Sequence, residues 1–186
     1  MDVKSLIYEQ IASGWLLVLS ALIFLVGGML YTGRAIWKWP VGQTHPYLIW
    51  ERGSVITALV VAVMGLTLLE RMLEAAGDRI LAPSGIMLLL IGASVVIFAE
   101  TYFVARQESL YAPIVVFVVL AFLSQAVLGA SLLLTGFLPA WVGWTAIIWN
   151  LAWLVILPIN RPQDMYYPWL HYVAPLMIGI VLLARR

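Results

Sequence analysis

The sequence predicts an all-α, polytopic integral membrane protein, built as a bundle of six transmembrane helices. One observation behind this prediction is composition, because 64% of the 186 residues are hydrophobic and only 10% are charged. In soluble globular proteins, roughly a quarter of the residues are charged. The other observation is that the apolar residues gather in six long stretches, since about 20 apolar helical residues cross a hydrocarbon core of about 30 Å. We therefore expect a single transmembrane domain over residues 1–186.

The six expected spans follow one another with mostly short connections. They are predicted at about residues 15–37, 49–69, 81–104, 111–134, 139–159 and 166–184. Pro139 and Pro168 stand near expected helix starts, where the missing N–H costs nothing. Pro175, inside the sixth span, is expected to kink the helix or to leave a carbonyl free. A cleaved signal peptide is the alternative for the first stretch, but no small-residue cleavage site follows its long polar lead.

The number of spans fixes which connections share a side of the membrane. With six spans, both termini lie on one side, called side A, and connections 32–48, 105–110 and 160–165 lie on the other, called side B. The cations divide evenly: side A has Lys4, Arg71, Arg79, Arg185 and Arg186, and side B has Arg34, Lys38, Arg52, Arg106 and Arg161. The positive-inside rule therefore does not orient the chain by itself. The terminal arginine pair favours a cytoplasmic side A and the basic first loop favours the reverse, and we expect the former.

Composition also excludes several classes of function. The chain has no cysteine, so disulfides, thiolate metal sites, iron–sulfur clusters and cysteine nucleophiles are excluded. Lys4 and Lys38 are its only lysines, and its net charge is +1. Nucleic-acid binding needs clustered cations opposite the phosphates. We therefore expect membrane lipids, and not nucleic acid, among the partners.

Polar and aromatic residues converge on side B. The polar candidates at similar height are His45, Glu51, Arg52, Glu100, Tyr102 and His171. Most of the Trp and Tyr residues also fall near side B: Tyr31, Trp37, Trp39, Tyr47, Trp50, Tyr102, Tyr111, Tyr166, Tyr167, Trp169 and Tyr172. One interpretation is an interfacial aromatic belt, which forms whatever the protein does. The other is a pocket for an amphiphile, quinone or pigment, lined by Glu100, His171, Arg52, Glu51, Tyr102, Trp50 and Trp169.

Glu100 and His171 carry the most chemistry of these candidates. A carboxylate this far inside a helix costs about 2–3 kcal/mol or more if it faces lipid, so Glu100 should pair with Arg52 or His171, or be protonated. Packing, proton handling and ligand binding all remain open for it. His171 has the donor type for a haem or a chlorophyll-type pigment. The only other histidine, His45, is expected in a loop, so a hydrogen bond from His171 to a neighbouring helix is favoured, and no metal site is predicted.

Two amides lie nearer mid-membrane. Gln125 and Asn150 are expected to form interhelical hydrogen bonds, because an amide in hydrocarbon needs a partner. Small residues recur every four positions beside Gln125, at Ala121 and Gly129, which predicts a close packing face. On side A, the charged run from Glu70 to Arg79 predicts an interfacial helical extension with local ion pairs.

Three segments carry a resemblance. They are Glu74-Ala-Ala-Gly-Asp-Arg-Ile-Leu-Ala82, Thr135-Gly-Phe-Leu-Pro-Ala-Trp-Val-Gly-Trp144 and Ile178-Gly-Ile-Val-Leu-Leu-Ala-Arg-Arg186. Over about the last two thirds of its length, the chain resembles a loosely defined group of small bacterial six-span membrane proteins of unknown function. The resemblance implies a compact six-helix bundle in a bacterial inner membrane. It supplies no catalytic residues.

Three classes of function are consistent with these residues. We expect a non-enzymatic membrane protein that binds a hydrophobic or amphiphilic ligand, or that serves as an accessory subunit beside other membrane subunits. An alternative is a carrier or channel for a small solute or a proton, using Glu100 and Arg52, although no span has the polar residues of a hydrated path. The third is a lipid- or quinone-modifying enzyme with Glu100 or His171 as acid or base, although no nucleophile is spaced to pair with a base.

Overall fold

The computed structural model describes residues 3–160 and 167–185, and the described chain is helical throughout apart from short turns. The helices are α1 (Val3–Ala35), the short 3₁₀ helix η1 (Pro40–Gln43), α2 (His45–Ala75), α3 (Leu81–Arg106), α4 (Tyr111–Thr135), α5 (Ala140–Asn160) and α6 (Leu170–Ala184). Within the described residues, α1 to α5 are the five helices long and apolar enough to cross a membrane. Helix α6 has 15 residues, which is about 22 Å at the α-helical rise and less than a bilayer core. The chain is therefore built as a multi-pass membrane protein, with five full-length spans and a shorter sixth helix.

The helix boundaries depart from the expected spans at three ends. Helix α1 begins at Val3 and not near residue 15, because its polar lead continues the helix, and α2 includes His45, which we expected in a loop. The sixth helix was predicted from residue 166, which lies outside the described residues, but it begins at Leu170. The reason is Pro168, which disfavours helical geometry in the residue before it. The N–H groups of residues 170–172 bond to the carbonyls three residues back, as in a tight turn.

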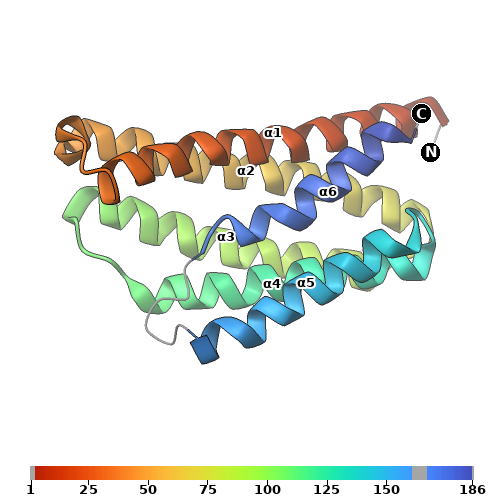
Figure 1. The fold of residues 1–186 in the computed structure, drawn as a ribbon. Coiled ribbons are helices and arrows are strands. Elements are labelled where there is room, and N and C mark those ends of the chain that lie inside the picture. The colour runs from red at the N-terminus through yellow and green to blue at the C-terminus, as the bar shows by residue number, and fades with distance from the viewer. Residues whose placement is uncertain (1–2, 161–166, 186) are drawn as a thin grey trace.

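The helices form an antiparallel bundle in which each helix contacts the next along the chain and α6 returns to α1. Figure 1 shows both termini at the right-hand end of the bundle, which is side A. It also shows that α6 begins between the two ends of α1, well short of the left-hand end, which is side B. The late start of α6 leaves a place in the ring of helices on side B that no described helix fills.

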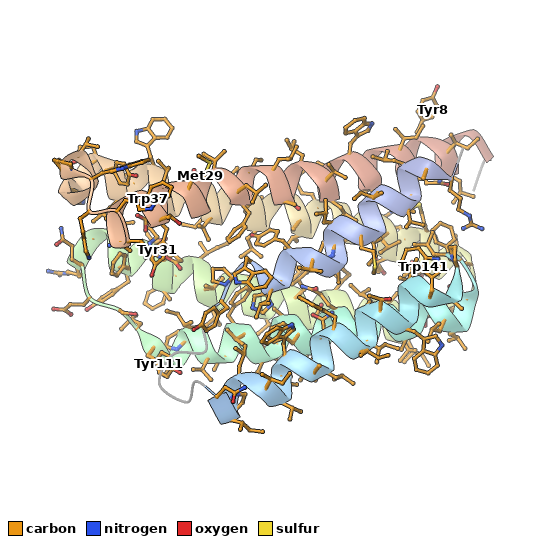
Figure 2. The ribbon with its side chains drawn as sticks, viewed as in Figure 1. Tyr8, Met29, Tyr31, Trp37, Tyr111 and Trp141 are labelled. Atoms are coloured by element: carbon orange, nitrogen blue, oxygen red, sulfur yellow. The ribbon has the colours of Figure 1, made fainter. Side chains whose placement is uncertain are left out.

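The outer surface of the bundle is apolar and rich in large side chains. Figure 2 shows Tyr8 and Trp141 near side A, and Tyr31, Trp37 and Tyr111 near side B. All five side chains lie on the outer surface of the protein and are exposed. Aromatic rings at the two ends of an apolar surface match the two interfaces of a bilayer.

Two pairs of glycines hold helices in backbone contact. A Cβ added to Gly129 of α4 would lie 2.9 Å from the carbonyl oxygen of Gly143 in α5, and one added to Gly143 would lie 2.8 Å from the carbonyl oxygen of Gly129. Gly14 of α1 and Gly179 of α6 face each other in the same way, at 3.1 and 2.9 Å. Helices in lipid associate through such close approach, because no hydrophobic force drives them together. Gly129 is the residue that the small-residue face of α4 predicted.

The turn between α2 and α3 is organised by Asp78 on side A. Its carboxylate is buried and accepts hydrogen bonds of 2.9 Å from the backbone N–H groups of Ile80, Leu81 and Ala82. These donors have no partner within α3, so Asp78 acts as the cap of that helix. Ion pairs within the charged run from Glu70 to Arg79 were expected here. Arg71 instead forms an ion pair with Glu9 of α1, at 3.3 Å.

The Asp78 cap predicts an acid-sensitive stability. Burial alone would raise the pKa of the Asp78 carboxyl, but the three backbone N–H groups that donate to it favour the carboxylate, and the net effect lowers the pKa. A lowered pKa in the folded state stabilises the fold above the unfolded value of about 4, and this contribution is lost as the pH falls through the folded value. We expect Asp78→Ala to lower the free energy of unfolding in detergent at pH 7 by about 1–2 kcal/mol. The difference from wild type should shrink below pH 4, and a difference that stays constant down to pH 3 would contradict the cap.

Candidate ligand-binding cavity

Four charged side chains form one chain of ion pairs near side B. Arg34, in the last turn of α1, donates to both oxygens of Glu51 at 2.7 and 2.8 Å. Arg52 Nε lies 3.2 Å from Glu51 Oε1, which also accepts from Arg34, and Arg52 Nη1 donates to Glu100 of α3 at 2.9 and 3.2 Å. Glu51 and Glu100 are buried. The chain joins α1, α2 and α3, and each buried carboxylate has a guanidinium partner, as a charge at this depth requires.

A cavity of about 660 Å³ lies against this chain of ion pairs. It is partly open, and it is lined by α1, α2, α3, the start of α4 and the turn that precedes α6, at the place left by the late start of α6. Its polar wall includes Glu51, Arg52 and Glu100, and its apolar wall includes Phe24, Leu25, Met29, Phe103 and Ile114. Volumes of 300–1,000 Å³ with a mainly apolar lining and a few polar groups are typical of small-molecule sites.

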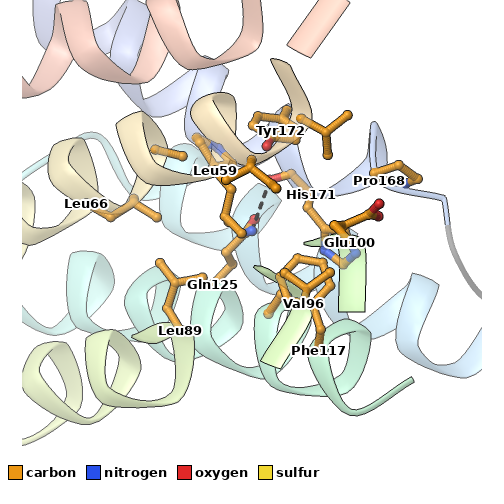
Figure 3. Close-up of a pocket in the computed structure, with 15 residues that line it drawn as sticks. Leu59, Leu66, Leu89, Val96, Glu100, Phe117, Gln125, Pro168, His171 and Tyr172 are labelled. Carbon is orange, nitrogen blue, oxygen red and sulfur yellow. Dashed lines mark hydrogen bonds between the residues drawn. The ribbon is translucent and has the colours of Figure 1, made fainter. Parts of the chain in front are cut away.

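A smaller recess of about 30 Å³ lies deeper in the bundle (Figure 3). Val55, Glu100 and Pro168 line both spaces, so the recess and the cavity adjoin at the Glu100 side chain. In Figure 3, Glu100 and His171 lie toward one end of the recess, and Leu66 and Leu89 lie toward the other. The structure thus brings together the carboxylate and the imidazole that the predicted topology placed at a common height.

Gln125 joins α4 to α6 through the carbonyl that a proline leaves free. Pro175 has no N–H, so the carbonyl of His171, four residues earlier, loses its partner within the helix. Gln125 Nε2 donates to that carbonyl at 3.0 Å (Figure 3). Trp149 Nε1 of α5 donates to the neighbouring carbonyl of Leu170 at 3.0 Å. The first turn of α6 is therefore fixed by hydrogen bonds from two different helices.

The surroundings of His171 do not fit a haem or chlorophyll-type pigment. The ring packs between Phe122 and Phe117, with centroid distances of 4.2 and 5.2 Å. The recess beside it, about 30 Å³, has room for one or two water-sized groups and none for a macrocycle. In the part of the chain that the structure describes, no three His, Asp or Glu side chains form a group that could hold a metal ion.

Several predicted site residues lie elsewhere. Trp50 is 72% exposed, and neither it nor Tyr102 lines the cavity or the recess; Tyr102 instead donates to Glu108 at 3.3 Å. Trp169 does line the cavity. Tyr172 is buried in the core, stacked on Phe24 at 4.4 Å, and is not part of an interfacial belt.

Asn150 also differs from expectation. It is fully buried, but its Nδ2 donates to the carbonyl of Ala146 in its own helix at 2.7 Å, and not to a neighbouring helix. The carbonyl four residues earlier lies on the same helical face, so the amide finds a partner without crossing to α4 or α6. The predictions for Arg161 and Tyr166 lie outside the described residues.

Sequence reasoning missed Arg34 and the apolar wall from α1. Arg34 was counted only as a loop cation on side B. The available signal was that two carboxylates near side B, Glu51 and Glu100, need more than the single cation Arg52. The apolar wall at Phe24, Leu25 and Met29 carries no signal, because every face of α1 is apolar at this depth.

No protein-family model, curated protein or solved structure matches this chain. The resemblance to small bacterial six-span proteins therefore stays a prediction, and the functional conclusion depends on the geometry of the cavity.

Proposed function

We propose that this protein is a non-enzymatic, small integral membrane protein that binds an amphiphilic ligand in the cavity near side B. The single observation that carries the proposal is a cavity of about 660 Å³ whose wall is largely apolar and whose charged side chains, Glu51, Arg52 and Glu100, belong to one cluster of ion pairs. The apolar part of the ligand lies against Phe24, Leu25 and Met29 of α1, and its polar end lies at Arg52 and Glu100. Amphiphiles match such a site because each end meets a wall of its own polarity.

The charge balance of the cavity restricts the headgroup. Arg34 and Arg52 neutralise Glu51 and Glu100, so the four side chains together have no formal net charge. A strongly charged headgroup would compete with these buried ion pairs, and separating a buried ion pair is costly. A neutral or zwitterionic headgroup that forms hydrogen bonds is therefore favoured.

The proposal places the chain in a bacterial inner membrane, with α6 completing a sixth pass and both termini cytoplasmic. Two of the five cations assigned to side B, Arg34 and Arg52, lie within the bundle in ion pairs. The described cations at the surface of side B are then Lys38 and Arg106, which are exposed. This distribution supports a cytoplasmic side A under the positive-inside rule.

A pair of glycine variants tests the proposed site. Gly28 lines the cavity, and a Cβ added to it meets no atom within 4 Å, so Gly28→Leu adds a large side chain at the cavity wall from a position open to a Cβ. Gly53 is equally open to a Cβ and does not line the cavity, so Gly53→Leu is the matched control. We expect the wild-type protein, purified in mild detergent, to retain a stoichiometric amphiphile that mass spectrometry of the extract detects. Gly28→Leu should retain at least about tenfold less, which corresponds to about 1.4 kcal/mol of binding free energy.

The control decides the interpretation of that experiment. Gly53→Leu should retain the same molecule in the same amount as the wild type. If all three proteins retain the same lipids in equal amounts, the cavity is not a ligand site. A stoichiometric protein partner and no small molecule would instead favour the accessory-subunit hypothesis.

A further inference from the structure

The recess beside the cavity contains buried polar atoms for which the described residues provide no hydrogen bond. They are both ring nitrogens of His171 and the amide oxygen of Gln125. The two residues are 6% and 5% exposed. Buried polar atoms in folded proteins nearly always have a partner.

The chemistry of the missing partner follows from the donors and acceptors. The Gln125 amide is oriented by its Nε2, which donates to the His171 carbonyl, so the other atom is an oxygen that needs a donor. A neutral imidazole has one N–H that needs an acceptor and one bare nitrogen that needs a donor. A carbonyl group only accepts and an ammonium group only donates. A hydroxyl group does both.

The size and position of the recess agree with this requirement. Its volume of about 30 Å³ is enough for one or two water-sized groups, since about 10–15 Å³ of such space holds one. The rest of its lining is largely apolar, with side chains such as Leu59, Leu66 and Leu89. The outer cavity adjoins the recess at Glu100. A group that enters from the cavity therefore reaches His171 past a carboxylate.

We propose that the recess is a hydroxyl-binding subsite, in which an O–H group hydrogen-bonds to His171 and Gln125. The hydroxyl belongs either to the end of an amphiphilic alcohol held in the outer cavity or to internal water. The first source rests on the proposed function, and the second does not.

Nitrogen NMR of a single histidine tests the subsite. The chain has two histidines, so His45→Gln leaves the ring of His171 as the only imidazole. His45 is exposed and lines neither the cavity nor the recess. The protein, with ¹⁵N-labelled histidine, is placed in phosphatidylcholine nanodiscs without additive, with 1-hexadecanol or with hexadecane. The references are 4-methylimidazole in water, where both nitrogens are hydrogen-bonded, and in cyclohexane, where they are not.

We expect at least one ring nitrogen of His171 to resonate near the hydrogen-bonded reference in at least one sample. A change with hexadecanol that hexadecane does not produce identifies an alcohol as the source. Hydrogen-bonded values that neither additive changes identify water. In both cases, Gln125→Leu should move the ring nitrogens toward the cyclohexane values, because it removes one of the two partners of the hydroxyl and puts methyl groups in its place.

Ring nitrogens that match cyclohexane in every sample would overturn the subsite. This failure is distinct from failure of the proposed function. If Gly28→Leu retains as much amphiphile as the wild type but the His171 ring is hydrogen-bonded to water, the proposed function fails and the subsite stands. If Gly28→Leu loses an amphiphile and the ring is never hydrogen-bonded, only the subsite fails.

Discussion

Replacing Arg52 with methionine is expected to destabilise the protein by about 3–5 kcal/mol, the cost of removing one partner from a buried ion pair. Arg52 is the only described cation within salt-bridge distance of Glu100, and it also contacts Glu51. Its removal takes from the buried Glu100 carboxylate the guanidinium that donates to both of its oxygens, whereas Glu51 keeps Arg34. The free energy of unfolding, measured in detergent micelles or bicelles at pH 7, should show the loss.

The matched control is Arg71→Met on side A. Arg71 also forms one ion pair, with Glu9, but its side chain is 55% exposed, so this change should cost less than about 1 kcal/mol. Adding Glu100→Gln to Arg52→Met should recover part of the stability, because a buried neutral amide depends less on the missing guanidinium than a buried carboxylate does. Equal losses for Arg52→Met and Arg71→Met would mean that the chain of ion pairs contributes nothing special to the fold.

Gly143→Val in α5 is the second substitution with a large expected effect. A Cβ at this position would lie 2.8 Å from the backbone oxygen of Gly129 and 2.7 Å from Leu133. The backbone cannot move aside cheaply, so α4 and α5 must separate. The cost should be about 3 kcal/mol, at the upper end for overpacking, and the variant should unfold at a lower temperature.

Gly53→Val is the control for this effect, because a Cβ at Gly53 meets no atom within 4 Å and the substitution has the same helix propensity cost. It should remain within about 1 kcal/mol of the wild type. Gly129→Val should resemble Gly143→Val, since the contact is reciprocal. If the variants at Gly53 and Gly143 unfold at the same temperature, the close α4–α5 contact does not stabilise the bundle.

The depth of each residue along the bundle could be predicted from the sequence, because hydropathy gives the ends of each span and the helical rise gives the distance from those ends. The spans and their direction placed Glu100 and His171 near one another, and in the structure both line the recess. Rotation about each helix axis could not be predicted in the same way. Trp50 and Glu51 are neighbours at one depth, but successive helical side chains point about 100° apart, and only Glu51 lines the cavity. A helix that is apolar on all sides gives no signal for which face points inward.

The hydrogen-bond partners of the buried polar groups could not be predicted from the sequence either. Pro175 predicted a free carbonyl and Gln125 predicted an interhelical donor, but only the packing of α4 against α6 shows that they satisfy each other. Asn150 has the same amide chemistry and bonds within its own helix. The late start of α6 follows from Pro168, yet its consequence, the cavity, depends on the lengths of the neighbouring helices.

The most direct test of the ligand cavity is photo-crosslinking with a long-chain alcohol that carries a diazirine near its polar end, added to the protein in nanodiscs. Mass spectrometry of the digested protein identifies the labelled residues. A ligand in the cavity should label residues from different helices that meet there, such as Phe24, Phe103 and Ile114, and Gly28→Leu should abolish that labelling. Labelling confined to exposed positions such as Ile148, Leu151 and Val155 of α5, unchanged in Gly28→Leu, would show that the alcohol meets only the outer surface and would contradict a binding site within the bundle.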